Sequence, residues 1–298
     1  MRARIAVPAT VANLGPGFDI LALALELQNE VEIDQTASGV VLDPGPDAPP
    51  ELCDPERNLV VRAYAQACAA MGVDAGGIAV RCVNRIPLRR GLGSSAAAAL
   101  GGVLGAVALH RPAWDEGDIL KQVTDLEGHP DNAAAALLGG LVIVAPGAAP
   151  VTMRVPEELL CVVFVPDMEI ATAAAREVVA ESFSRADAVY NASRCALFVR
   201  AIAERDYASL RAAMDDRWHQ TQRSALMPAM PDIISAALRA GACGSCLSGA
   251  GPSILALTFS DPAAIQEAMA AAASAHSIGG RSIVSRVRNY GARVDTSV

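Results

Sequence analysis

Apolar and polar positions in the first part of the 298-residue chain alternate over two separate stretches. Residues 2–7 and 30–35 contain β-branched side chains in near alternation, which predicts two strands. Between them, residues 8–25 contain Asn, Gly and Pro and then an apolar run, so we expect a loop that leads into a buried segment. Residues 44–50, with sequence PGPDAPP, are typical of a surface loop.

Helical spacing appears next in the sequence. Apolar positions recur at that spacing over 58–71, and Gly72 follows as a stop signal. A strand is expected at 78–83, and a helix from about Ser95 to Leu109.

Two helices and a strand are expected between residues 118 and 145. The first helix runs over 118–127, is capped by its own Asp118, and ends at the Gly-His-Pro break. Asp131 or Asn132 caps the second helix, which reaches residue 138, and a strand follows at 141–145.

The second half of the chain begins after PGAAP at 146–150, a composition typical of a linker. We therefore expect an α+β protein of two domains, 1–150 and 151–298. The elements expected in the second domain are strands at 160–165, 253–258 and 281–287, and helices near 173–183, 186–203, 206–222, 231–240 and 261–274.

Charge and composition exclude several classes of partner and site. The formal net charge is −8 and the pI is about 5.1, so neither nucleic acid nor an anionic membrane is expected as a partner. No apolar segment has the make-up of a signal peptide or a membrane span. Lys121 is the only lysine, which excludes a Walker-type phosphate loop.

The cysteines indicate a cytoplasmic protein with reduced thiols. Seven cysteines, an odd number scattered along the chain, do not make a disulfide framework. Cys243 and Cys246 match C-x-x-C, but no second pair is present to complete a metal site. We expect both to be packing residues.

The segment RGLGSSAAAA at 90–99 places two glycines and two serines at the start of an expected helix. Unpaired amides at a helix N-terminus, approached across glycines, favour a phosphate. Two alternatives remain from the residues alone: a glycine turn with a serine N-cap, and a dinucleotide loop of Gly91, Gly93 and Ala96 with Asp115 beyond it. The dinucleotide loop lacks its usual strand context.

Three segments resemble motifs of the GHMP small-molecule kinases: IPLRRGLGSSAAAA at 86–99, PATVANLGPGFDILALAL at 8–25 and CLSGAGPSILAL at 246–257. The resemblance implies a two-domain GHMP kinase fold, with an N-terminal part like ribosomal protein S5 domain 2 and a ferredoxin-like C-terminal part. It implies ATP and Mg²⁺ as cofactors, and that the third segment packs beside the phosphate loop. A homodimer would be ordinary for such an enzyme.

The resemblance also implies nucleotide and metal contacts. Asn58 would touch the base, and Ser95 and Glu127 would bind Mg²⁺, a hydroxyl and a carboxylate that suit a hard cation. Taken alone, Glu127 is a solvated carboxylate at a helix end. The expected nucleotide contacts are Asn58, Pro87, Leu88, Arg89, Arg90, Gly91, Leu92, Gly93, Ser94, Ser95, Ala96 and Ala97.

Within the family, residues 8–25 and 127–140 resemble most the kinases of L-homoserine, the small-molecule substrate then expected. Asp19 would face the ammonium, and the arginines would bind the carboxylate through a guanidinium fork. Without the resemblance, these residues read as turn, cap and surface-helix positions. The expected substrate contacts are Asn13, Asp19, His129, Thr172, Arg176 and Arg223.

Catalysis is expected to involve Asp19, His129 and Asn132. Mevalonate-kinase-like members use an aspartate with a lysine as the base, whereas the matching position here is Asn132, whose amide cannot accept the hydroxyl proton. The resemblance therefore implies transfer by positioning and Mg²⁺ electrostatics, with the proton passing to the γ-phosphate or solvent. Asp131 is the neighbouring carboxylate that could still act as a base.

The reaction expected from the resemblance is ATP-dependent phosphorylation of the side-chain hydroxyl of L-homoserine, a step of threonine biosynthesis. One alternative is another GHMP kinase, of the mevalonate or diphosphocytidyl-methylerythritol type. A second alternative is a catalytically silent nucleotide-binding regulator, against which the presence of Ser95 and Glu127 argues.

Overall fold

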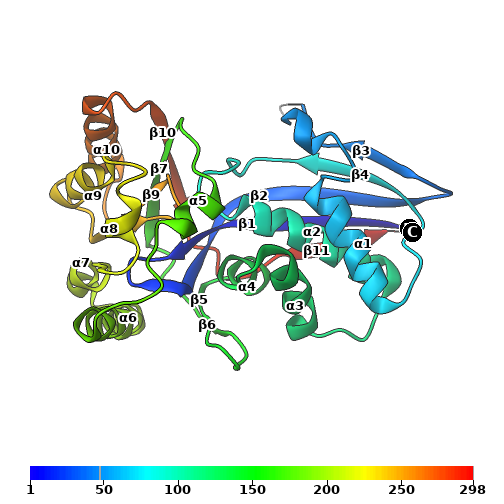
Figure 1. Cartoon of the computed structure of the whole chain (residues 1–298), viewed down its shortest axis with the longest axis horizontal. Helices are drawn as coiled ribbons and strands as arrows, with labels where there is room; N and C mark the ends of the chain where they lie inside the picture. The colour runs from blue at the N-terminus through cyan, green and yellow to red at the C-terminus, as the bar shows by residue number, and fades with distance from the viewer. Residues whose placement is uncertain (47, 298) are drawn as a thin grey trace.

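Two antiparallel-rich sheets organise the protein, here seen in a computed structural model that describes residues 1–46 and 48–297 (Figure 1). Asp47, in the expected surface loop, and Val298, at the end of the expected second domain, lie outside the described residues. The first sheet has the strand order β11-β1-β2-β4-β3, with β5 on β2 and β6 on β5; the second has the order β10-β7-β9-β8. This mixture of helices and sheets is the expected α+β class.

A long hairpin of β1 (Arg2–Asn13) and β2 (Gly17–Thr36) forms the centre of the first sheet. The loop predicted for 8–25 is wrong, because both strands continue through it and only residues 14–16 turn. Residues 21–25 are buried on both faces of β2. A strand buried on both faces loses its alternation, so the sequence pattern did not reveal it.

The remaining strands of the first sheet are short. They are β3 (Val40–Asp43), β4 (Gly77–Val83), β5 (Leu141–Ile143), β6 (Val151–Met153) and β11 (Arg293–Ser297). Strands β6 and β11 follow residue 150 in the sequence, yet they belong to this sheet. Strand pairing thus crosses the expected domain boundary, which stays a prediction.

Four helices of the first half pack beside this sheet: α1 (Leu59–Met71), α2 (Ser94–His110), α3 (Glu116–Glu127) and α4 (Asp131–Leu138). Two predicted caps are wrong. Asp115, not Asp118, is the N-cap of α3, and the two side chains form a capping box. Helix α4 has no side-chain cap, since Asp131 lies inside its first turn and Pro130 precedes it.

The second sheet contains β7 (Leu160–Pro166), β8 (Gly244–Leu247), β9 (Ile254–Thr258) and β10 (Gly280–Arg286). Helices α9 (Met230–Arg239) and α10 (Ala263–Ala275) pack together against it, at the left of Figure 1. Strand β8 contains Cys246, which is fully buried, so the packing role expected for that thiol is confirmed.

Four helices and one 3₁₀ helix lie between β7 and α9 in the chain. They are α5 (Thr172–Glu177), α6 (Arg185–Glu204), η2 (Tyr207–Ser209), α7 (Leu210–Ala213) and α8 (Gln220–Arg223). The helix predicted over 206–222 is wrong, because the Asp216 carboxylate accepts hydrogen bonds from the amides of residues 218–220. An aspartate that binds nearby amides competes with a continuous helix. The helix expected over 173–183 already ends at Glu177.

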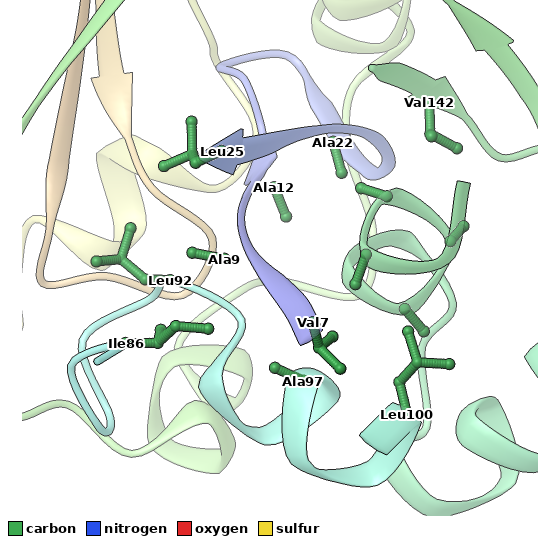
Figure 2. Close-up of a cluster of buried hydrophobic side chains, with 14 of the residues drawn as sticks. Val7, Ala9, Ala12, Ala22, Leu25, Ile86, Leu92, Ala97, Leu100 and Val142 are labelled. Atoms are coloured by element: carbon green, nitrogen blue, oxygen red, sulfur yellow. The ribbon is translucent and has the colours of Figure 1, made fainter. Parts of the chain in front are cut away.

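Small residues let α2 lie close to its neighbours in the core. Ala97 and Leu100 of α2 belong to the same buried cluster as Val7 of β1 (Figure 2). A side chain at Gly102 would overlap the Val60 carbonyl of α1, so glycine is needed for the two helices to touch. The core therefore fixes the position of α2 and of its N-terminus.

Within the described residues, none of the helices combines the length and the apolar character that a bilayer crossing needs.

Candidate active site

A cleft of about 490 Å³ lies between the two sheets and brings together most of the residues that the sequence analysis singled out. It is lined by these predicted positions: Asn13, Asp19, residues 88–96, Glu127, His129, Asn132, Thr172, Arg176 and Arg223. Three predicted nucleotide contacts, Asn58, Pro87 and Ala97, do not line it. Asn58 instead caps α1, with Oδ1 accepting from the amides of Val60 and Val61.

The phosphate loop ends in an open helix N-terminus. Gly93 is the N-cap of α2, at φ 69°, and no side chain caps the helix, so the serine N-cap alternative is wrong. The first amide that bonds back along the helix is that of Ala97, to the Gly93 carbonyl. The amides of residues 94–96 are therefore left for a ligand, and the helix dipole favours an anion there.

Glycine is required twice in this loop for steric reasons. Gly91 and Gly93 both have positive φ, and a Cβ at Gly93 would overlap Thr10 Oγ1. A Cβ at Gly91 would overlap the carbonyl of Ser248, whose hydroxyl donates to Gly91 O at 2.6 Å. The segment 246–257 thus packs beside the phosphate loop, as expected.

Ser95 and Glu127 meet at the edge of this loop. Ser95 Oγ donates to Glu127 Oε1 at 2.6 Å. Burial raises the pKa of the Glu127 carboxyl, while the serine bond acts in the opposite direction. A hydroxyl and a carboxylate at this distance form a donor pair that suits a hard divalent cation.

The junction of α3 and α4 contributes a hydrogen-bonded chain. His129 Nδ1 lies 3.2 Å from Asp131 Oδ1, and that carboxylate oxygen also accepts from the Asn132 amide. The pKa of His129 is raised, chiefly by its bond to Asp131. Thr10 Oγ1 donates to Asn132 Oδ1 at 2.7 Å. Sequence reasoning missed Thr10, a buried strand residue with no local signal of a role.

Asp19 and Arg176 pair with each other across the cleft. Arg176 Nη2 and Nη1 lie 2.6 and 3.0 Å from the two oxygens of Asp19. Each of these two side chains therefore has the other as its charged partner. Asn13 Oδ1 accepts from the Asp19 amide, which fixes the turn that carries this carboxylate.

Arg223 lies at the base of the cleft, only 3% exposed. It is a buried cleft residue and not the surface arginine that its sequence context alone suggested. Burial lowers its pKa to about 10, so the guanidinium stays charged at neutral pH. Sequence reasoning missed the buried His219, four residues earlier, which contacts it.

Arg89 and Arg90, which precede Gly91, contact the second half of the chain. Arg90 Nη2 donates to the carbonyl of Asp167, and both Arg89 and Arg90 pair with Glu169, so the phosphate loop is tied to the second half of the chain. Among the described residues, no group of three or more histidine, cysteine, aspartate or glutamate side chains could hold a metal ion on its own.

Comparison with known proteins gives consistent results. Residues 58–140 match the model of the GHMP kinases N terminal domain, and residues 198–275 match that of the GHMP kinases C terminal. A homoserine kinase of Desulfitobacterium hafniense is 39% identical over 98% of this chain and 99% of that protein. A homoserine kinase of a Synechococcus species is 38% identical over 99% of this chain and 98% of that protein.

Solved structures of kinases are similar in fold to this chain. The crystal structure of a homoserine kinase from Cytophaga hutchinsonii has a TM-score of 0.89 at 31% identity, covering 99% of this chain and 97% of that one. A Lactococcus lactis galactokinase, at 12% identity and a TM-score of 0.73, covers 98% of this chain and 95% of that one and shares the fold. On the strength of these full-length matches, the chain belongs to the GHMP kinase family.

Proposed function

We propose that this GHMP kinase is a homoserine kinase, which transfers the γ-phosphoryl group of ATP to the side-chain hydroxyl of L-homoserine and yields O-phospho-L-homoserine for threonine biosynthesis. One observation carries the proposal: a single cleft contains an open anion site at the N-terminus of α2 and, beside it, the opposite charges of Asp19 and Arg176. A nucleotide fits the first feature, and a zwitterionic amino acid fits the second.

ATP would bind with its phosphates against the amides of residues 94–96. The left-handed glycines let the backbone approach the phosphates closely, and the loop has no lysine to neutralise them. Asn58 and the rest of the predicted nucleotide contacts stay part of this proposal. Leu52 and Leu59 line the same cleft and offer apolar surface for a base.

Mg²⁺ would be held by Ser95 Oγ and the Glu127 carboxylate, whose 2.6 Å contact brings two hard oxygen donors to the phosphate loop. When bound, the metal would neutralise charge on the transferring phosphoryl group. Partial burial of Glu127 raises its pKa, and a partly buried carboxylate beside an anion site favours a cationic partner.

L-Homoserine would bind by exchanging partners with the Asp19–Arg176 pair. Its ammonium would replace Arg176 at Asp19, and its carboxylate would replace Asp19 at the arginines. Thr172, in the first turn of α5, and His129 would lie toward the rest of the substrate, since both line the cleft.

The reaction needs no dedicated base in this proposal. Asn132 Oδ1 accepts a bond from Thr10, and an amide cannot take up the hydroxyl proton. Positioning of the two substrates then supplies most of the rate, and the proton passes to the γ-phosphate or to solvent, as a loose phosphoryl transition state allows.

Product identification tests the function. Incubation with Mg-ATP and L-homoserine is expected to give a phosphate monoester on the side-chain oxygen, seen by ³¹P NMR and mass spectrometry. Mevalonate and diphosphocytidyl-methylerythritol, offered in parallel, are expected to stay unphosphorylated. Nucleotide binding without transfer to any alcohol would make the protein a silent regulator and would end the proposal.

A matched pair of variants tests the metal site. Glu127→Gln is expected to weaken binding of Mn²⁺-ATP by at least about tenfold, read by calorimetry or electron paramagnetic resonance. Glu116→Gln, at the other end of the same helix, should leave it unchanged. Equal binding by both variants would remove Glu127 from the metal site.

The proposal also includes the location and the partners of the enzyme. We place it in the cytoplasm, acting on small molecules and without nucleic acid or membrane as partner; the possible homodimer stays a prediction.

A further inference from the structure

Arg223 has most of its hydrogen-bonding capacity committed to the protein. Nε donates to the Ala175 carbonyl at 2.8 Å, and Nη1 donates to the Gly249 carbonyl at 2.9 Å and to His219 Nδ1, 3.1 Å away. Among the described residues, Nη2 has no hydrogen-bond partner, and the side chain lines the cleft. Three of the five donors thus orient the guanidinium, and Nη2 is left for a ligand.

The ring of His219 can satisfy both of its contacts in one form only. A guanidinium has no acceptor, so Nδ1 must accept from Arg223. Nε2 then carries the hydrogen and donates to the carbonyl of Gly15 at 2.8 Å. The residue is fully buried, and burial lowers the pKa of His219 to about 4, consistent with a neutral ring at physiological pH.

His219 is itself held on two sides. Asp216 Oδ2 accepts from the His219 amide at 2.9 Å, which fixes the backbone at the start of α8. The ring of Phe18 lies 5.3 Å from the imidazole and 5.2 Å from the Arg223 guanidinium, measured to ring centroids and to Cζ. Phe18 precedes Asp19, so the same contacts join Arg223 to the turn that carries Asp19, the residue proposed to bind the substrate ammonium.

From this network we propose that His219 is a positioning residue for substrate recognition: its neutral ring joins Arg223 to the Gly15 turn, so that Nη2 points at the carboxylate of the bound amino acid. The proposal rests on the proposed function, because it takes the ligand to be an α-amino acid. His219 does not touch the substrate and acts only through Arg223 and Gly15.

Two polar variants separate the two contacts of the ring. His219→Asn places an amide near Nδ1 and can keep the bond from Arg223, whereas His219→Gln reaches the Nε2 position and keeps only the contact with Gly15. We expect His219→Gln to raise KM for L-homoserine at least about tenfold, and His219→Asn less than about threefold. The KM for ATP should change less than twofold in both.

An acceptor without a carboxylate gives a readout that a purely structural role would not move. With 3-aminopropan-1-ol, which has no carboxylate for Arg223, the difference between the two variants is expected to disappear. A difference of the same size with this acceptor, or an equal loss in both variants with L-homoserine, would overturn the proposal.

The wild-type enzyme offers a second measurement that does not depend on either variant folding. Nitrogen-15 NMR of the four histidines should show His219 neutral at pH 7 with its hydrogen on Nε2. A hydrogen on Nδ1, or a charged ring, would contradict the proposal. If the wild-type enzyme fails to phosphorylate L-homoserine at all, the proposed function fails first, whatever the state of His219.

Discussion

The proposed phosphate site and the proposed amino-acid site lie in the same cleft, but the first is made of backbone amides and the second of side chains. The loop uses backbone amides at the start of α2, which point the same way and cannot bond to one another. The subsite uses the side chains of Asp19 and Arg176, which have opposite charges and bond to each other. The amides at the start of α2 have no side-chain cap, whereas Asp19 and Arg176 are paired with each other.

This difference teaches where each site obtains its selectivity. An open set of amides accepts any phosphate of the right shape, so the nucleotide meets a ready site. A self-paired site has to lose an ion pair before it binds, and only a ligand with both charges restores both partners. Selection of the acceptor is therefore expected to depend on how Asp19 and Arg176 exchange their ion pair for contacts with the ligand.

The largest effect is expected from Gly93→Ala, which changes the N-cap of α2. A Cβ there would overlap Thr10 Oγ1 and would shift the amides of α2, so kcat/KM should fall by about 100-fold or more, measured by steady-state kinetics. Gly72→Ala is the matched control, because Gly72 has the same φ of 69° in open space. Equal losses of activity would show that backbone strain alone is responsible.

The next effect concerns the side-chain site. Asp19→Asn should raise KM for L-homoserine by about 10- to 100-fold, because a charged hydrogen bond to the ammonium is lost. The double variant Asp19→Asn, Arg176→Gln should lose less than the two single changes combined, since the residues are coupled through their pair. Additive losses in this double-mutant cycle would mean that the pair does not compete with substrate.

A smaller effect is expected from Asp131→Asn. Asp131 accepts from the Asn132 amide, which an asparagine oxygen can still do, so kcat should stay within about tenfold of wild type. Single-turnover kinetics with both substrates bound would measure it. Loss of turnover with intact binding would make Asp131 the base and would contradict the base-free proposal.

The smallest effect is one of acid stability. The pKa of His219 is about 4 in the folded protein against an ordinary 6.5, so the folded state binds fewer protons between these values. The stabilisation is complete above about pH 6.5 and is lost as pH falls toward 4. Asp19 and Asp216, whose charges favour the imidazolium, and Arg223, whose charge opposes it, face this ring.

Thermal denaturation between pH 7 and pH 4.5 would measure this effect. The Tm of wild type should fall by about 3 °C or more beyond that of His219→Asn. His276→Asn, which changes the partly exposed histidine that pairs with Asp232, should follow the wild-type curve. A parallel curve for His219→Asn would contradict the buried neutral ring.

The sequence could predict the open amides at the start of α2, but not the pairing of Asp19 with Arg176. Gly91, Gly93 and the helix after them are local signals, and each lies where it was expected. The contact between Asp19 and Arg176 joins segments far apart in the chain, so no local pattern contains it. His219 was missed because a buried histidine has the same local pattern as any helix-start residue.

Two fold features were unpredictable for other reasons. The break in the helix predicted over 206–222 depends on which amides the Asp216 carboxylate captures, a choice set by tertiary contacts. Strand β11 is exposed along its whole length, so it carries no alternation that would indicate a strand.

The pairing of β11 with β1 has a consequence for how the chain is made. Strand β1 is the first and β11 the last of the described strands, yet Arg2 is aligned with Ser297. During synthesis, one edge of β1 therefore stays unpaired until residues 14–292 have been made. Such an edge can pair with foreign strands, so chains in which β11 has not yet been made are expected to aggregate more readily than the finished protein.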